Sequence, residues 1–209
     1  MPQVQRISLK AQVYEIIRQK ILNQEYALGE KLNIDIIAEE LKISNSPIRE
    51  ALMMLSQDGL IELVPNNGAK VVSFSEQSYH EIASSLYVIL YGAYDLCMRL
   101  GTIEEVAQKM ANYLQQQQAC FDAGNIPESV KFALQFDKCI VHGTNNSYLL
   151  ALYERIEDVF YLMALYNHQR GAEDRHNNIL EHKMILESIQ NRDAEQLHHW
   201  LGVHYDKHL

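Results

Sequence analysis

The chain has 209 residues, 47% of them hydrophobic, and a formal net charge of −9. This length allows one large domain or two small ones, each with a core of its own. The acidity counts against nucleic acid as a partner, because neutralising phosphates usually requires a surface rich in lysine and arginine. The charge is unevenly distributed, however: 8 Lys and Arg face 9 Asp and Glu up to residue 75, and 10 face 18 after it.

The first 20 residues contain several charged side chains and no unbroken apolar run, which argues against a signal peptide and a membrane span. We therefore expect a cytoplasmic protein. The cysteines, Cys97, Cys120 and Cys139, are odd in number and lack the spacing of a zinc ribbon. Reduced and mostly buried thiols are their expected state.

Three short helices are predicted in the first 60 residues. Apolar residues recur at spacings of three and four over 8–22, and a second short helix is expected over 34–41. Ser44 then provides an N-cap for a third helix, and Pro47 lies in its first turn, where a missing N–H is harmless. This helix is expected to end at Gly59.

A β-hairpin is predicted after the third helix. The hydrophobic period changes to two in residues 60–64 and 69–72, which is typical of short strands. The intervening Pro65-Asn66-Asn67-Gly68 contains an Asn-Gly step that favours a tight turn. Three short helices followed by a hairpin form the winged variety of the helix-turn-helix. We assign residues 1–75 to such a domain.

Residues 76–209 are predicted to form an all-α domain, so the protein as a whole should be mainly α. No strand pattern reappears, and residues such as Gly101 and Asn125 separate segments of helical length. The glutamine run at 115–118 is interpreted as a solvated helix face. The expected helices cover residues 76–100, 102–122, 127–145, 147–169, 173–190 and 193–208.

The segment from Tyr14 to Val72 resembles the DNA-binding domain of the GntR family. The resemblance is carried by IDIIAEELKISNSPIREAL at 34–52, by Gly59-Leu60-Ile61 and by Asn67-Gly68-Ala69. It covers about 60 continuous residues, with the serines, the proline and the arginine at the spacing that the family uses. The resemblance implies a DNA-binding regulator whose recognition helix begins near residue 44.

The start of this helix carries the candidate DNA contacts. Ser44 and Ser46 would lie on the phosphate backbone, where free amides and the helix dipole favour an anion. Arg49 can reach guanine or a phosphate, and Glu50 beside it is expected to orient it. Between the two serines the family typically has a base-reading arginine, whereas this chain has Asn45, which can pair with adenine.

Two further features complete the expected DNA contacts. Asp35 stands where relatives carry a basic residue, which should weaken electrostatic attraction to DNA. In the turn of the wing, Asn66, Asn67 and Gly68 are small enough to enter a minor groove.

The acidic helical part resembles the ligand-sensing domain of the FadR subfamily in its FCD variety, a bundle of six to seven helices. The match is EHKMILESI at 181–189, followed by Arg192-Asp193-Ala194-Glu195 and then His204. Members of this group commonly bind a divalent metal through an aspartate and up to three histidines. The resemblance implies that His182 and His204 are two of these ligands.

Helical spacing supports the metal hypothesis independently. His182, His204 and Asp137 each share a face with apolar residues of their own helix. A buried carboxylate needs a partner or a metal, and inward groups on three helices can converge in a bundle. Ala133, however, stands where the family has the aspartate, and Asp137 where it has a histidine. His142 is a conceivable substitute ligand, but it lies five residues beyond Asp137 and therefore about 140° around the helix.

Asp137, His182 and His204 would therefore form a three-ligand site for zinc, nickel or manganese, completed by water or by a carboxylate of the effector. A metal-free cavity or hydrogen-bonded polar groups in the core would explain the same pattern. Family members often hold the effector with an arginine on the first helix of this domain, and residues 86–94 contain none. Tyr87, Tyr91 and Tyr94 are the candidate effector contacts there, with ordinary packing as the alternative.

The expected function is that of a ligand-responsive bacterial transcription regulator, which binds a palindromic operator as a homodimer. We expect a repressor controlled by a small metabolite. An enzyme is the competing class, since a metal beside histidines activates water. It is not favoured, because the sequence lacks Gly-x-Ser-x-Gly, His-Glu-x-x-His and a phosphate loop. A winged helix that binds protein is the third class, and substitution of Arg49 would distinguish it.

Overall fold

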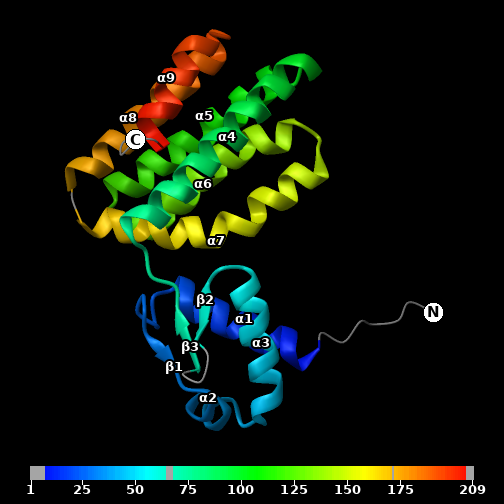
Figure 1. The fold of residues 1–209 in the computed structure, drawn as a ribbon. Coiled ribbons are helices and arrows are strands. Elements are labelled where there is room, and N and C mark those ends of the chain that lie inside the picture. Colours follow the sequence, from blue (N-terminus) through cyan, green and yellow to red (C-terminus); the bar gives the residue numbers. More distant parts are fainter. Residues whose placement is uncertain (1–7, 65–67, 171, 206–209) are drawn as a thin grey trace. The chain divides into compact units, whose positions relative to one another are not determined.

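The computed structural model describes residues 8–64, 68–170 and 172–205 (Figure 1). Contacts divide the chain into two compact units, Met1–Phe74 and Ser75–Leu209. The first unit combines short helices with a small sheet, and the described part of the second consists of helices and short connections without strands. The predicted mainly α fold is confirmed.

In the first unit, three helices enclose a small apolar core. They are α1 (Leu9–Leu22), α2 (Ile34–Leu41) and α3 (Asn45–Gln57), and α3 packs on both of the others. Their inward positions are buried because apolar residues recur every three or four positions. The core includes Val13, Ile17, Ile21, Ile37, Ile48, Leu52 and Leu55.

A three-stranded antiparallel sheet completes the first unit. Strands β2 (Ile61–Val64) and β3 (Gly68–Val71) form the expected hairpin, and β1 (Lys31–Leu32) pairs with β3 on its other side. Gly59 has a φ of 77° where the chain leaves α3 and turns toward β2. The short strand β1 was not predicted, because two residues carry no detectable alternation.

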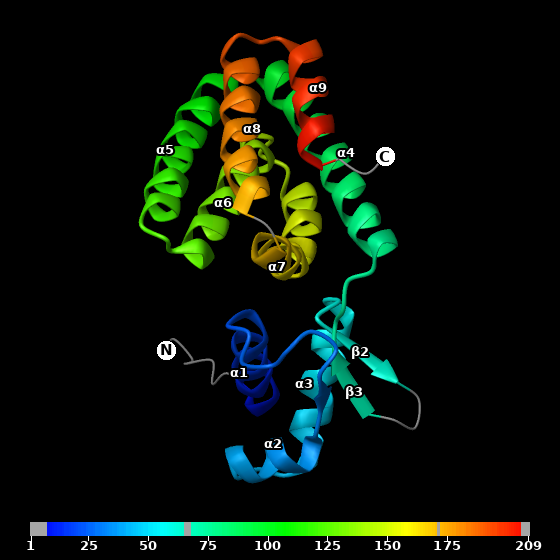
Figure 2. The same cartoon turned by 90° about the vertical axis from the view of Figure 1, so that its left-hand side faces the viewer.

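The second unit is a helical bundle. It contains α4 (Glu76–Leu100), α5 (Ile103–Asp122), α6 (Ile126–Gly143), α7 (Ser147–Arg170), α8 (Ala172–Gln190) and α9 (Ala194–Tyr205). Helix α5 packs against α6 and α8, and α9 packs against α8 and α4. In Figure 2, α7 is seen nearly end-on while α4, α5, α8 and α9 run along the page. The helices agree with the predicted segments to within a few residues.

Helix α6 comes very close to α4 and α5 at Gly143. A Cβ atom at this position would lie 2.2 Å from Cγ2 of Val106 and 2.9 Å from Sγ of Cys97.

Cys97 and Cys139 are buried, Cys120 is partly buried, and all three are free thiols, as expected. Among the described helices, none combines the length and the apolar character needed to cross a bilayer.

Candidate functional site

The N-terminal end of α3 lacks a capping hydrogen bond from its N-cap side chain, unlike the N-terminal ends of α1, α2 and α4. Ser44 occupies the N-cap position, but its side chain makes no capping hydrogen bond. By contrast, the N-cap side chains of Ser8, Asn33 and Ser75 accept hydrogen bonds from the first turns of α1, α2 and α4. Ser44 and Ser46 are exposed. The first amides of α3 and the positive end of its dipole are therefore accessible to an anion.

Arg49 lies on the exposed side of α3 and, among the described residues, makes no hydrogen bond or ion pair. The expectation that Glu50 orients it is wrong. Glu50 instead faces α1, where its carboxylate lies 3.4 Å from the ammonium of Lys10. Since the adjacent acid is engaged elsewhere, the Arg49 guanidinium is available to a base or a phosphate.

Asn45 is tied to the start of α2. Its side-chain amide donates a hydrogen bond from Nδ2 to Oδ1 of Asp35, at 2.9 Å. Asp35 is itself held by its backbone N–H, which donates to Oδ1 of the N-cap residue Asn33 at 2.9 Å. Asp35 and Asn45, the two positions where the family typically has basic residues, are thus in direct contact.

The turn between α2 and α3 carries a cation that sequence reasoning did not single out. Lys42 is exposed, ends α2 with a left-handed backbone (φ 54°), and stands two residues before Ser44. The sequence feature that could have identified it is a lysine in the turn of the helix-turn-helix, close to Ser44. Lys10, Lys20 and Lys70 of this unit form ion pairs with glutamates, as in the cross-strand pair of Lys70 with Glu62 at 2.7 Å.

The wing is described only in part. Asn66 and Asn67, which were predicted to enter a minor groove, lie outside the described residues. Gly68 is exposed at the start of β3, opposite Val64 of β2. The strands that carry the turn are therefore formed as expected.

In the second unit, the structure gathers Asp137 from α6, His182 from α8 and His204 from α9. Asp137 and His182 are 2% and 1% exposed, and the His204 side chain is 5% exposed. The two imidazole rings lie with their centroids 4.6 Å apart, and Phe136 stacks on His182 at 4.4 Å. Sequence reasoning placed these side chains correctly on inward faces.

Each histidine directs Nδ1 at a polar group that accepts a hydrogen bond. Nδ1 of His182 lies 2.7 Å from Oε1 of Gln117, and Nδ1 of His204 lies 2.8 Å from Oε2 of Glu181. An amide or carboxylate oxygen accepts, so Nδ1 donates in both residues. In a neutral imidazole Nε2 then carries the lone pair, which is the tautomer that a metal-binding histidine needs.

Gln117 corrects the interpretation of the glutamine run as a solvated face. Its side chain is 2% exposed, and its Nε2 donates to Oδ1 of Asn178 on α8 at 2.9 Å. One of the four glutamines thus faces the core and links α5 to α8. Composition alone could not identify it, because its partners are about 60 residues away along the chain.

Asp137 is a buried acid without a lysine or arginine partner among the described residues. The hydroxyl of Tyr205 donates to its Oδ2 at 2.6 Å. Burial raises the pKa of Asp137 from 3.8 to about 6, against the lowering effects of the charge of His204 and of the Tyr205 hydrogen bond. The carboxyl is therefore costly to keep ionised in this place.

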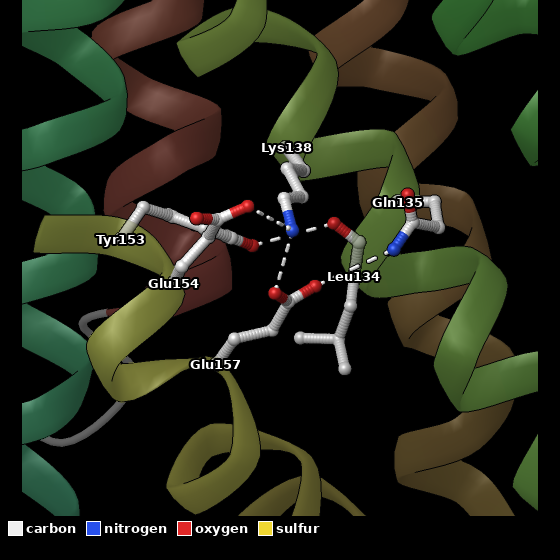
Figure 3. Close-up of polar contacts among 6 residues, drawn as sticks. All are labelled: Leu134, Gln135, Lys138, Tyr153, Glu154 and Glu157. Atoms are coloured by element: carbon white, nitrogen blue, oxygen red, sulfur yellow. Dashed lines mark hydrogen bonds and ion pairs between the residues drawn. The ribbon is translucent and has the colours of Figure 1, made fainter. Parts of the chain in front are cut away.

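The next residue, Lys138, points to a different set of groups (Figure 3). Its ammonium lies 3.1 Å from Oε1 of Glu154 and 2.7 Å from Oε2 of Glu157, both on α7. Burial opposes the charge of Lys138, but its hydrogen bonds to the two glutamates prevail and raise its pKa. Lys138 therefore links α6 to α7 and does not pair with Asp137, whose hydrogen-bond donor is Tyr205.

The three candidate effector tyrosines of α4 do not share one environment. Tyr87 and Tyr91 stack with ring centroids 6.2 Å apart, and both lie against His198 of α9, to which the Tyr87 hydroxyl is hydrogen-bonded. Tyr94 is buried in the core, and this burial raises its pKa. Six residues separate His198 from His204, or about 9 Å along a helix axis. Tyr87 and Tyr91 therefore contact α9 about 9 Å along its axis from His204, the residue of α9 that interacts with Asp137.

Comparison with known families agrees with this geometry. Residues 9–71 match the family described as "Bacterial regulatory proteins, gntR family", and residues 90–207 match the FCD domain. The chain belongs to the GntR family of regulators and carries an FCD domain. This GntR-family protein is a transcription regulator and not an enzyme, because its family and its named relatives are regulators.

Relatives of this GntR-family protein are similar over almost its whole length. An uncharacterized HTH-type transcriptional regulator of Bacillus subtilis, YdhC, is 25% identical over 93% of this chain and 87% of that protein. The gluconate operon transcriptional repressor of Bacillus licheniformis is 24% identical over 91% of this chain and 79% of that protein.

Solved structures share the fold. McbR/YncC of Escherichia coli has a TM-score of 0.72 at 21% identity, with 97% of this chain and 95% of that chain covered. A putative transcriptional regulator GntR from Rhodococcus has a TM-score of 0.71 at 15% identity, with 96% and 95% covered.

The metal expected in an FCD domain can be tested against the residues present. The donor chemistry fits, because both histidines have Nδ1 engaged and the carboxylate of Asp137 interacts with His204. The observed arrangement is less complete: within the described part of the chain, no group of three or more His, Cys, Asp or Glu is positioned to hold an ion. Ala133 provides no ligand, and His142 is exposed.

Proposed function

We propose that this protein is a ligand-responsive transcription regulator that binds a palindromic operator as a homodimer. The observation that carries the proposal is the exposed N-terminal end of α3, where Ser44, Ser46 and Arg49 lie together. Such an end lies in the major groove when a helix-turn-helix reads DNA. A regulator of this kind acts in the cytoplasm, where the DNA is.

A homodimer is favoured by the weak electrostatics of one DNA-binding unit. The first 75 residues are nearly neutral, so one copy neutralises few phosphates. Two linked copies on two half-sites would compensate for this, because the second contact becomes intramolecular. The helical unit would supply the contact between copies. The named repressors among the relatives favour repression. The FCD domain favours control by a small metabolite.

Within the helical unit, Asp137, His182 and His204 would hold a zinc, nickel or manganese ion. The tautomers set by Gln117 and Glu181 support this assignment. The metal would act as a Lewis acid for an oxygen of the effector, such as a carboxylate. The alternative is that the same residues form a metal-free, hydrogen-bonded part of the core.

Effector contacts are proposed at Tyr87 and Tyr91, whereas Tyr94 is 4% exposed and packs in the core. Tyr87 and Tyr91 are only partly buried and form an aromatic surface with His198. Aromatic faces and hydroxyls suit a ligand that combines apolar and polar groups.

The DNA-binding proposal is tested by selecting bound fragments from the source genome and measuring affinity for the recovered operator. The Arg49→Ala variant should lose about 1–3 kcal/mol of binding free energy if the guanidinium contacts a base. The exposed Arg99 of the helical unit is the matched control, and Arg99→Ala should bind like the parent. An unchanged affinity of Arg49→Ala would favour a winged helix that binds protein.

The metal assignment is tested on protein stripped of metal with a chelator. Zinc, nickel or manganese should raise the melting temperature of the parent and of His142→Ala, but not that of His182→Ala. His142 serves as the control because it is exposed on α6. If none of these ions stabilises the parent, the hydrogen-bonded core is the correct description. Operator affinity measured with and without candidate metabolites then tests regulation, because a regulatory ligand must change that affinity.

A further inference from the structure

A single hydrogen bond joins the two helices of the DNA-reading motif at their starting ends. Asp35 lies in the first turn of α2 and Asn45 is the first residue of α3, and the bond runs from Nδ2 of Asn45 to Oδ1 of Asp35. Asp35 is exposed and Asn45 is half-buried, between the exposed Ser44 and Ser46. The pair thus lies on the surface where the candidate DNA contacts gather.

This bond determines which hydrogen-bonding groups Asn45 can offer. A side-chain amide has two N–H donors and one carbonyl acceptor. The carboxylate of Asp35 only accepts, so it holds one N–H and fixes which end of the amide is nitrogen. One N–H and the carbonyl oxygen Oδ1 remain available to a base.

That remaining set matches one base in the major groove. Adenine presents a donor at N6 beside an acceptor at N7, whereas guanine presents acceptors at both O6 and N7. A carbonyl and an N–H side by side satisfy adenine. Facing guanine, the carbonyl oxygen would meet O6, and the Asp35 bond opposes the rotation that would present both N–H groups.

The charge of Asp35 has the opposite effect on overall affinity. A carboxylate on this surface repels the phosphates, and the DNA-binding unit has few cations to offset it. Asp35 would therefore lower the affinity for every DNA sequence and at the same time increase the difference in affinity between bases, which is what determines specificity.

We propose that Asp35 is a positioning residue, which orients the Asn45 amide so that each half-site requires adenine at one position. The inference rests on the proposed DNA-binding function and adds to it the base that Asn45 selects. Asp35 need not touch the DNA for this effect.

The test measures base preference and affinity for unrelated DNA separately, by selection from a randomised half-site and then by titration. The parent should prefer adenine over guanine at one position of each half-site by about 5- to 150-fold. In Asp35→Ala this ratio should fall at least fivefold, while affinity for unrelated DNA rises. In Asp35→Asn the acceptor is kept without the charge, so the adenine preference should persist while affinity for unrelated DNA rises.

Glu39→Ala is the matched control. Glu39 is an exposed acid on the same helix, so its loss changes the charge equally but leaves Asn45 in place. The adenine preference should stay at the level of the parent. Asn45→Ala should abolish it.

Two outcomes would overturn the proposal: an adenine preference in Asp35→Ala equal to that of the parent, or one that survives in Asn45→Ala. Failure of the parent to bind any selected DNA would instead refute the proposed function itself. Circular dichroism and thermal unfolding of each variant separate these outcomes from misfolding.

Discussion

The carboxyl of Asp137 should destabilise the metal-free protein near neutral pH, and its replacement reveals by how much. Its pKa is about 6 in the folded chain, against an ordinary value of 3.8. The folded state therefore binds this proton more tightly than the unfolded state, so the free energy of unfolding falls as pH rises. The loss begins near pH 3.8 and is complete above about pH 6. At 1.36 kcal/mol for each pK unit it amounts to about 3 kcal/mol.

In Asp137→Asn this loss should disappear. The asparagine keeps an oxygen that can accept the hydrogen bond of Tyr205, but it does not ionise. The free energy of unfolding of the variant should therefore vary less with pH between about 4 and 7 than that of the parent, by roughly 2–3 kcal/mol. Comparing slopes, rather than absolute stabilities, removes the constant effect of burying an amide.

The chain has a single tryptophan, Trp200 of α9, so its fluorescence reports unfolding of the helical unit alone. Urea titrations at several pH values in the presence of a chelator would give both slopes. Asp122→Asn is the control, because Asp122 is exposed at the end of α5. Parallel pH profiles for the parent and Asp137→Asn would refute the claim that burial raises the pKa of this carboxyl.

Three further substitutions test the open end of α3, the close approach at the end of α6 and the partly buried cation Lys138. Ser44→Asp adds a charge that the dipole of α3 favours, so stability should be unchanged or up to about 1 kcal/mol higher, whereas operator binding weakens by repulsion of a phosphate. Equal operator affinity in filter binding would argue against a phosphate at this end. Gly143→Ala should lose about 1–3 kcal/mol of unfolding free energy through overpacking. Gly92→Ala, with nothing within 4 Å of the added Cβ in the middle of α4, should gain about 0.5–1 kcal/mol in the same urea titration. Lys138→Met leaves two glutamates of α7 without their cation and should cost about 1–3 kcal/mol, measured by thermal unfolding. Lys131→Met, which breaks an exposed pair with Glu128, should cost under about 0.5 kcal/mol, and equal losses would contradict a special role for burial.

Local signals explain why so much of the fold was predictable. The ends of α3 follow from Ser44 and Gly59, and the wing follows from the Asn-Gly step and a period of two. These features depend on residues within a few positions of one another. Strand β1 escaped prediction because it exists only through pairing with β3, which is about 40 residues away.

The polar partners in the candidate site were unpredictable for the same reason. The contacts of His182 with Gln117 and of Asp137 with Tyr205 each join residues more than 60 positions apart. Periodicity placed Asp137, His182 and His204 on inward faces, but it could not show which polar groups meet them there. Helix packing alone decides this, and it also turned Glu50 away from Arg49 and toward Lys10 of α1.

The chemistry of Asp137 connects stability to sensing. The ionised carboxyl of Asp137 costs about 3 kcal/mol near neutral pH in the metal-free protein. A ligand that binds only the folded protein stabilises it by about 2.7 kcal/mol when its concentration is a hundred times its Kd. At that ratio of concentration to Kd, a metal ion held by Asp137, His182 and His204 would offset a cost of about this size. The helical unit would then be more stable when it is loaded than when it is empty. Such a ligand changes the affinity for DNA only as far as it binds the two conformations of the regulator with different affinity.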